Sequence, residues 1–180
     1  MKFDVLEGGI RVPFCMRWTG VVPASRTFAP MVHVFDICAT ALAAAGVTGV
    51  DGLDGVDLLP YVTGSAAGIP HARLFWLYND HKEWRIPGRD TNLARPLRAV
   101  REGDEKWVAE GDRPPELYDL AQDLGETHNL AAARPERAAA LQQAWNAWHA
   151  EMTPQRIPDD HPLYGRYKRM KPGARTAEDP

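Results

Sequence analysis

Side chains able to act as nucleophiles or metal ligands are scattered along the chain and form no familiar motif. Neither Ser25 nor Ser65 stands in the Gly-x-Ser-x-Gly pattern that places a serine nucleophile on a sharp turn. No two histidines show the helical zinc spacing of i and i+4; they are His33, His71, His81, His128, His149 and His161. His33 lies in an apolar run and is expected in the core, whereas His149 is expected at the surface. Spacing therefore singles out no metal site, although ligands can also converge in space.

Aspartates and cysteines also favour ordinary structural roles. Asp51, Asp54 and Asp57 recur at every third residue, but their loop lacks the EF-hand pattern and its closing glutamate, so a turn is predicted instead of a calcium site. Cys15 and Cys38 lie in apolar runs, which favours free, buried thiols over a single disulfide bridge.

Lys2 is the residue with the clearest chemical alternative. Its ammonium group is a compact positive charge that suits a sulfate or phosphate oxygen, and Glu7-Gly8-Gly9 follows shortly after it. From spacing alone, the simpler interpretation is a solvated lysine near a frayed end. The two glycines alone indicate a turn that feeds a strand.

Composition excludes several classes of protein. The chain has 180 residues, of which 44% are hydrophobic, and this suits one ordinary globular domain or slightly more. A net charge of -3 gives no electrostatic reason to expect nucleic acid or an anionic membrane as partner. The first residues lack the apolar stretch of a signal peptide and no long apolar window occurs, so the chain as it stands is expected in the cytoplasm.

Hydrophobic periodicity predicts the order of the elements. Alternation predicts a strand over Ile10–Trp18, and helical spacing predicts a largely buried helix over Met31–Ala45. A second amphipathic helix is expected over Pro135–Met152, with Leu141, Trp145, Trp148 and Met152 in one apolar stripe. Between the helices we expect a helical turn within Val56–Val62, then strands at Arg73–Tyr78, Leu97–Arg101, Lys106–Ala109 and Glu116–Leu120. Prolines and a basic cluster after Thr153 predict a poorly ordered, solvated tail.

Several short blocks in order make the sequence similar to a known family. They are Lys2 with Glu7–Pro13, Arg17–Gly20, Val34–Ile37, Leu53–Pro60, Leu97–Asp104, Glu116–Leu120 and Asp123–Ala131. Each block is weak alone, but the set resembles the C-terminal part of the formylglycine-dependent sulfatase (arylsulfatase) family.

The resemblance implies an α/β fold class, here an α+β fragment. Residues 1–70 would supply the last strand and helix of the large, alkaline-phosphatase-like sulfatase domain. Residues 71–152 would form a small antiparallel sheet with a covering C-terminal helix, and residues 153–180 the tail. The resemblance also implies that Lys2 contacts the substrate sulfate, while Arg11 and Asp36 take structural roles.

The remaining chemistry of the family is not expected in this chain. Family members use a formylglycine made from the Cys or Ser of a Cys/Ser-x-Pro-x-Arg motif, and neither cysteine begins such a motif. Val22–Arg26 echoes it only in part. No catalytic residue and no metal ligand are therefore assigned, and calcium and formylglycine are implied only for the complete enzyme. The loop 79–95 is expected to border the substrate cleft of the complete enzyme, where its His81 and Trp84 would influence which sulfate ester fits.

We therefore predict the C-terminal part of a sulfate monoester hydrolase that is inactive alone. It would be either a gene fragment or a subunit that complements a separate N-terminal sulfatase polypeptide. The alternative is a non-catalytic binding or interaction module that reuses the small subdomain.

Overall fold

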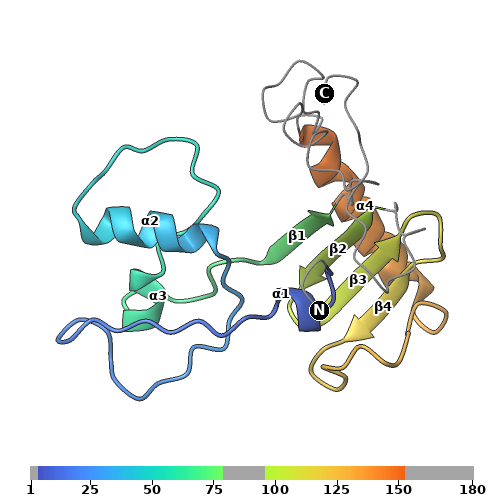
Figure 1. Cartoon of the computed structure of the whole chain (residues 1–180), viewed down its shortest axis with the longest axis horizontal. Coiled ribbons are helices and arrows are strands. Elements are labelled where there is room, and N and C mark those ends of the chain that lie inside the picture. Colours follow the sequence, from blue (N-terminus) through green and yellow to red (C-terminus); the bar gives the residue numbers. More distant parts are fainter. Residues whose placement is uncertain (1–3, 79–95, 153–180) are drawn as a thin grey trace, which may run out of the picture.

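A four-stranded antiparallel sheet crossed by one long helix forms the best-packed part of the molecule. The computed structural model describes residues 4–78 and 96–152. The strands run in the order β1 (Arg73–Tyr78), β2 (Leu97–Glu102), β3 (Glu105–Glu110) and β4 (Glu116–Asp119). Helix α4 (Pro135–Glu151) lies across one face of the sheet (Figure 1). The predicted α+β architecture is therefore confirmed, with the strands and α4 close to their predicted positions.

Side chains alternate between two apolar clusters, one on each face of the sheet. Toward α4, the strand residues Val100, Trp107, Ala109 and Leu117 pack against Ala138, Leu141 and Trp145. On the opposite face, Val5 and Leu6 of the N-terminal segment pack with Ala99, Val108, Tyr118 and Leu120. This alternation follows from the period of two in a pleated strand. The sheet is therefore covered on both sides by segments from opposite ends of the described chain.

Turns and a short loop complete the sheet. Glu102 pairs with Glu105 across a two-residue turn in which Gly103 has a φ of 59°, a value that glycine adopts without strain. At the β4 edge, the side chain of Asn129 accepts a hydrogen bond from the Leu117 amide at 3.1 Å, and the Leu130 amide donates to the Leu117 carbonyl at 2.7 Å. The loop after β4 thus satisfies backbone groups that the edge strand would leave unpaired.

The region before the sheet contains three short or medium helices and long irregular stretches. They are α1 (Glu7–Ile10), α2 (Phe35–Ala44) and α3 (Leu59–Thr63). The strand predicted over Ile10–Trp18 is wrong, since Ile10 closes α1 and residues 11–18 have no regular structure. A strand requires a neighbour for its backbone hydrogen bonds, and no described segment pairs with this one.

Helix α2 is shorter and more exposed than predicted. It begins at Phe35 and buries only Asp36, Ala39 and Thr40, whereas Phe35 and Ile37 are exposed. The thiols of Cys15 and Cys38 are free but exposed, which corrects their predicted burial. Met152 is also exposed, so the apolar stripe of α4 ends before it. Among the described residues, no helix is both long and apolar enough to cross a membrane.

Candidate functional site

The residue with a predicted substrate contact lies outside the described part of the chain. Lys2 precedes the first described residue, and the loop residues His81 and Trp84 fall in the second undescribed range. Their predicted roles therefore stay predictions. The described residues nearest in sequence to Lys2 are Asp4 to Arg11, and these lead directly to a buried group of charges.

A buried lysine joins the N-terminal segment to the sheet. Lys106 is on β3, and its side chain is fully buried. Its Nζ lies 2.9 Å from Oε1 of Glu7 and 2.8 Å from Oε1 of Glu126. Both carboxylate side chains are almost fully buried. We call Glu7, Lys106 and Glu126 the ion cluster.

Two arginines border the ion cluster on its Glu7 side and add positive charge there. Arg101 and Arg11 place Nη1 at 3.4 and 3.2 Å from Oε2 of Glu7. Burial acts to raise the pKa of Glu7, but the hydrogen bond from Lys106 and the charges of Lys106 and Arg101 hold that pKa below its ordinary value. Glu7 is therefore an ionised carboxylate at neutral pH. Arg11 takes a structural part here, as an i, i+4 partner of Glu7.

The loop after β4 brings Glu126 to the cluster in an uncommon backbone conformation. Glu126 has a φ of 54°, in the left-handed region that residues other than glycine rarely adopt. Asp123 supports the loop by accepting hydrogen bonds from the amides of Thr127 at 2.8 Å and His128 at 2.7 Å. The Glu126 carboxylate also accepts a hydrogen bond from the Glu7 amide at 2.6 Å. Glu126 thus binds both the lysine and the backbone of α1.

A second buried carboxylate organises the region around α2. Asp36 is fully buried and accepts hydrogen bonds from the amides of His33 at 2.6 Å and Val56 at 2.9 Å. Nε2 of His71 lies 2.8 Å from Oδ2 of Asp36. His33 is half-buried, and burial lowers its pKa despite the opposing charge of Asp36. This centre ties α2, the loop 54–57 and the approach to β1 together.

Among the described residues, the potential metal ligands do not gather into a metal site. Within residues 4–78 and 96–152, no three side chains of His, Cys, Asp or Glu converge as a metal site would require. The residues present here therefore do not fit a calcium ion. Ser65 hydrogen-bonds the Pro60 carbonyl, His128 pairs with Asp123, and His149 stacks on Trp145.

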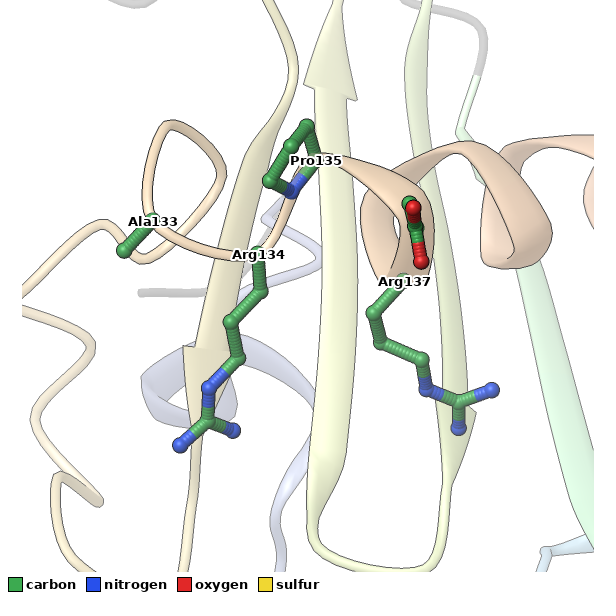
Figure 2. Close-up of a pocket in the computed structure, with 5 residues that line it drawn as sticks. Ala133, Arg134, Pro135 and Arg137 are labelled. Carbon is green, nitrogen blue, oxygen red and sulfur yellow. The ribbon is translucent and has the colours of Figure 1, made fainter.

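One surface hollow of about 350 Å³ lies where α4 begins. It is lined by Ala133, Arg134, Pro135, Glu136 and Arg137, and Figure 2 shows the two arginine side chains extending in the same direction along the strands. Both arginines are already engaged: Arg134 pairs with Glu105, and Arg137 pairs with Glu102 and Glu105. This hollow offers no free cation for a ligand.

Comparison with known proteins identifies the family. A family model described as "N-sulphoglucosamine sulphohydrolase, C-terminal" matches residues 2–152. The chain belongs to the sulfatase family. An uncharacterized sulfatase of Schizosaccharomyces pombe is 30% identical over 165 residues, which are 88% of this chain and 28% of that protein. Human arylsulfatase D is 27% identical over 143 residues, which are 69% of this chain and 24% of that protein.

Solved structures show the same partial correspondence in the fold. The crystal structure of Ps i-CgsB has a TM-score of 0.61 at 20% identity. The matched part covers 88% of this chain and 33% of the Ps i-CgsB chain. A putative sulfatase from Bacteroides fragilis has a TM-score of 0.57 at 13% identity and covers 83% of this chain and 30% of its own. The sulfatase chain described here thus spans about a quarter to a third of the length of these relatives. Its predicted family and fold class are confirmed.

Sequence reasoning missed the ion cluster, although one signal for it was present. Lys106 lies in the alternating run Lys106–Ala109, where it shares a face of the strand with Val108. A lysine at an inward position predicts a buried charge, and a buried charge requires a paired partner. The partners Glu7 and Glu126 are far away in sequence, so spacing gave no means of finding them.

Proposed function

We propose that this chain supplies the C-terminal part of a sulfate monoester hydrolase and hydrolyses no sulfate ester alone. The observation that carries the proposal is the match of residues 2–152 to the C-terminal region of a sulfohydrolase family, whose relatives extend over three to four times the length of the match. Lys2 is proposed to contact the sulfate. The formylglycine nucleophile and the calcium ligands of the complete enzyme are proposed to belong to a separate or upstream polypeptide.

The distribution of exposed apolar side chains supports a partner of this kind. The sheet with α4 and their connections, residues 73–78 and 96–152, are called the sheet unit below. Among the described residues, twelve of the fourteen exposed large hydrophobic side chains fall between Val12 and Ile69, and only Leu124 and Met152 lie in the sheet unit. Val12 is 73% exposed and Val34 is 65% exposed. Where such side chains gather into one contiguous patch, they mark interaction sites in soluble proteins. We propose that the N-terminal part of a sulfatase covers these side chains.

The alternative is a non-catalytic interaction module. The observation that favours it is the well-packed sheet and α4, which bury an apolar cluster on each face. A module predicts a monomeric chain with one sharp, cooperative thermal transition that includes residues 11–70. If the chain is instead part of a larger enzyme, the amides of residues 11–70 are expected to be protected from hydrogen exchange only when the partner is added.

The experiment begins with the DNA upstream of the codon for Met1. A sulfatase N-terminal polypeptide encoded there is expressed separately, and aryl-sulfate hydrolysis is measured for each polypeptide and for the mixture, with calcium and without host sulfatases. Turnover by the mixture alone is expected. Turnover by the purified 180-residue chain contradicts the proposal.

Matched variants locate the contact surface in the same experiment. Val12→Asp places a charge among the exposed apolar residues between Val12 and Ile69. Leu124→Asp is the matched control, because it places the same charge at an exposed apolar residue of the sheet unit. Val12→Asp is expected to weaken association by about tenfold or more, because an unpaired charge is desolvated at the interface. Leu124→Asp is expected to leave association unchanged. Equal effects of both variants contradict the proposed surface.

A further inference from the structure

We infer that His33 is a pH-dependent cap of α2: its neutral imidazole holds the first turn of the helix, and protonation of the ring releases that turn. The inference goes beyond the proposed function, because it concerns a conformational response of this chain to acid. Only its consequence for a partner, given last, rests on the proposed function.

His33 and Asp36 bracket the start of α2 in the manner of a capping box. Nδ1 of His33 accepts a hydrogen bond from the Phe35 amide at 3.3 Å. The His33 carbonyl accepts from the Asp36 amide at 3.0 Å, and the Asp36 carboxylate accepts in return from the His33 amide at 2.6 Å. A capping box has this reciprocal pattern, in which two side chains three residues apart satisfy amides that the helix leaves unpaired. Here a histidine ring takes the place of the usual hydroxyl group.

A histidine in this place makes the cap depend on the charge of the ring. Nδ1 accepts a hydrogen bond only in the neutral imidazole, because both ring nitrogens carry a proton in the imidazolium form. Protonation of His33 therefore removes the acceptor of the Phe35 amide and points a second donor at it. The positive charge also lies at the amino end of α2, where the helix dipole disfavours cations. A hydroxyl or amide cap has no such response.

The surroundings of His33 favour its neutral form. Burial lowers the pKa of His33 below its ordinary value of 6.5, the charge of Asp36 opposes this effect, and a protonated His71 adds to it. The Asp36 carboxylate is already engaged by the Val56 amide at 2.9 Å and by Nε2 of His71 at 2.8 Å. In the adjacent loop, the Asp57 carboxylate accepts from the first amide of α3.

The direction of the pKa shift gives the pH window of the response. The unfolded chain binds a proton at His33 more readily than the folded chain does. The contribution of the neutral cap is therefore complete above pH 6.5 and is lost as the pH falls from 6.5 through the lower folded-state pKa. The pKa values of Glu7 and Glu102 lie below 4.5 in the folded chain, so both carboxylates stay ionised in this window.

The first turn of α2 carries part of the exposed apolar surface. Val34 is 65% exposed, Phe35 55% and Ile37 48%. Figure 1 shows α2 well apart from the sheet. Release of this turn is therefore expected to displace these apolar side chains while the sheet unit keeps its structure.

The test measures amide hydrogen exchange in the full chain at about pH 8 and about pH 5, the range in which histidine titrates, with a correction for the intrinsic pH dependence of exchange. In the unmodified chain, α2 amides are expected to exchange about fivefold faster or more at the lower pH, as loss of a helix cap implies. Amides of β2 and β3 are expected to change by less than about twofold. His33→Asn keeps a capping acceptor that does not titrate and is expected to abolish the acid response of α2. His33→Ala is expected to give fast exchange at both pH values.

Two further variants assign the response to His33. His71→Gln removes the ionisable ring beside Asp36 and is expected to keep the acid response of α2. His128→Asn is the matched control, because it makes the same change at an exposed histidine of the sheet unit, and it is expected to keep the response as well. The inference is overturned if the unmodified chain shows no acid response in α2, or if His33→Asn shows a response of the same size. Slow exchange of α2 at both pH values in His71→Gln overturns it too.

The consequence for a partner has a separate readout. Association with the N-terminal sulfatase polypeptide is measured at the same two pH values for the unmodified chain and for His33→Asn. Acid is expected to weaken association of the unmodified chain about threefold more, because fewer molecules then present Val34 and Phe35 in the bound arrangement. Equal weakening overturns the link between the cap and the apolar surface. Absence of association at both pH values rejects the proposed function, whereas the exchange data decide the cap.

Discussion

The sheet with α4 and the region from residue 11 to residue 70 contain similar amounts of apolar residues but differ in how they bury them. In the first, alternating side chains are divided between two buried clusters, one against α4 and one against the N-terminal segment. In the second, α2 exposes Phe35 and Ile37 and buries mainly a carboxylate and a hydroxyl, those of Asp36 and Thr40. The contrast indicates that the sheet unit has its own core, while the earlier region is organised by polar contacts and leaves its apolar side chains available.

The polar organisation of the earlier region nevertheless depends on close backbone packing. Asp36 and Thr40, on one side of α2, accept hydrogen bonds from the amides of Val56 and Leu58. Gly55 comes immediately before Val56 in the loop and lies directly against the backbone at the start of α2. This region thus has a defined local conformation without a large apolar core.

The first prediction tests whether the sheet unit carries the stability of the isolated chain. Leu141 is fully buried between α4 and the sheet, so Leu141→Ala is expected to lower the free energy of unfolding by about 2–5 kcal/mol. Leu124 is 50% exposed, and Leu124→Ala is expected to change the free energy of unfolding by less than about 0.5 kcal/mol. Urea unfolding followed by circular dichroism measures both. Similar values for the two variants would show that the α4 interface is not the main core.

The sheet unit was predictable because its signals are local. The strands at Arg73–Tyr78 and Glu116–Asp119 and helix α4 follow from alternation, helical period and Pro135 at a helix start. The hairpin follows from Gly103 in a two-residue turn. Each of these segments finds its partner among the described residues, so the local pattern and the final structure agree.

The first seventy residues were predicted less well for a physical reason. The apolar alternation over Ile10–Trp18 is a strand pattern, but a strand forms only where another backbone accepts its hydrogen bonds. Likewise, the helical pattern at Met31–Ala45 predicts an apolar face without saying what will cover it. The candidate site was missed for a related reason: the partners of Lys106 come from positions 7 and 126, and sequence spacing carries no information on such pairs.

The second prediction examines the close packing in the earlier region. A Cβ at Gly55 would lie 2.1 Å from the carbonyl oxygen of Phe35, so Gly55→Ala requires the loop or α2 to move. We expect a local cost of about 1–3 kcal/mol, visible as faster limited proteolysis within residues 31–63. At Gly125 the added atom meets only ordinary contacts, the nearest 3.5 Å away, so Gly125→Ala is the matched control in the other region. If Gly55→Ala also lowers the stability of the sheet unit by the same amount, the two regions unfold together and the contrast between them fails.

The third prediction concerns acid and the N-terminal segment that packs on the sheet, and its effect is the smallest. The pKa of Glu7 is below its ordinary value of 4.5 in the folded chain, so the ionised form stabilises the folded segment. Its contribution is complete above the unfolded-state pKa and is lost as the pH falls through the lower folded-state pKa. Amide exchange at residues 7–11, corrected for its intrinsic pH dependence, is therefore expected to accelerate as the pH drops below 4.5.

Glu102 is also held at a lowered pKa, with burial opposed by Arg73 and Arg137, so the sheet itself loosens in acid to some degree. Glu7→Gln separates the two effects: this variant should lose the additional acid sensitivity at residues 7–11 while the sheet keeps its own. An unchanged acid response in Glu7→Gln would mean that another group links the N-terminal segment to the sheet.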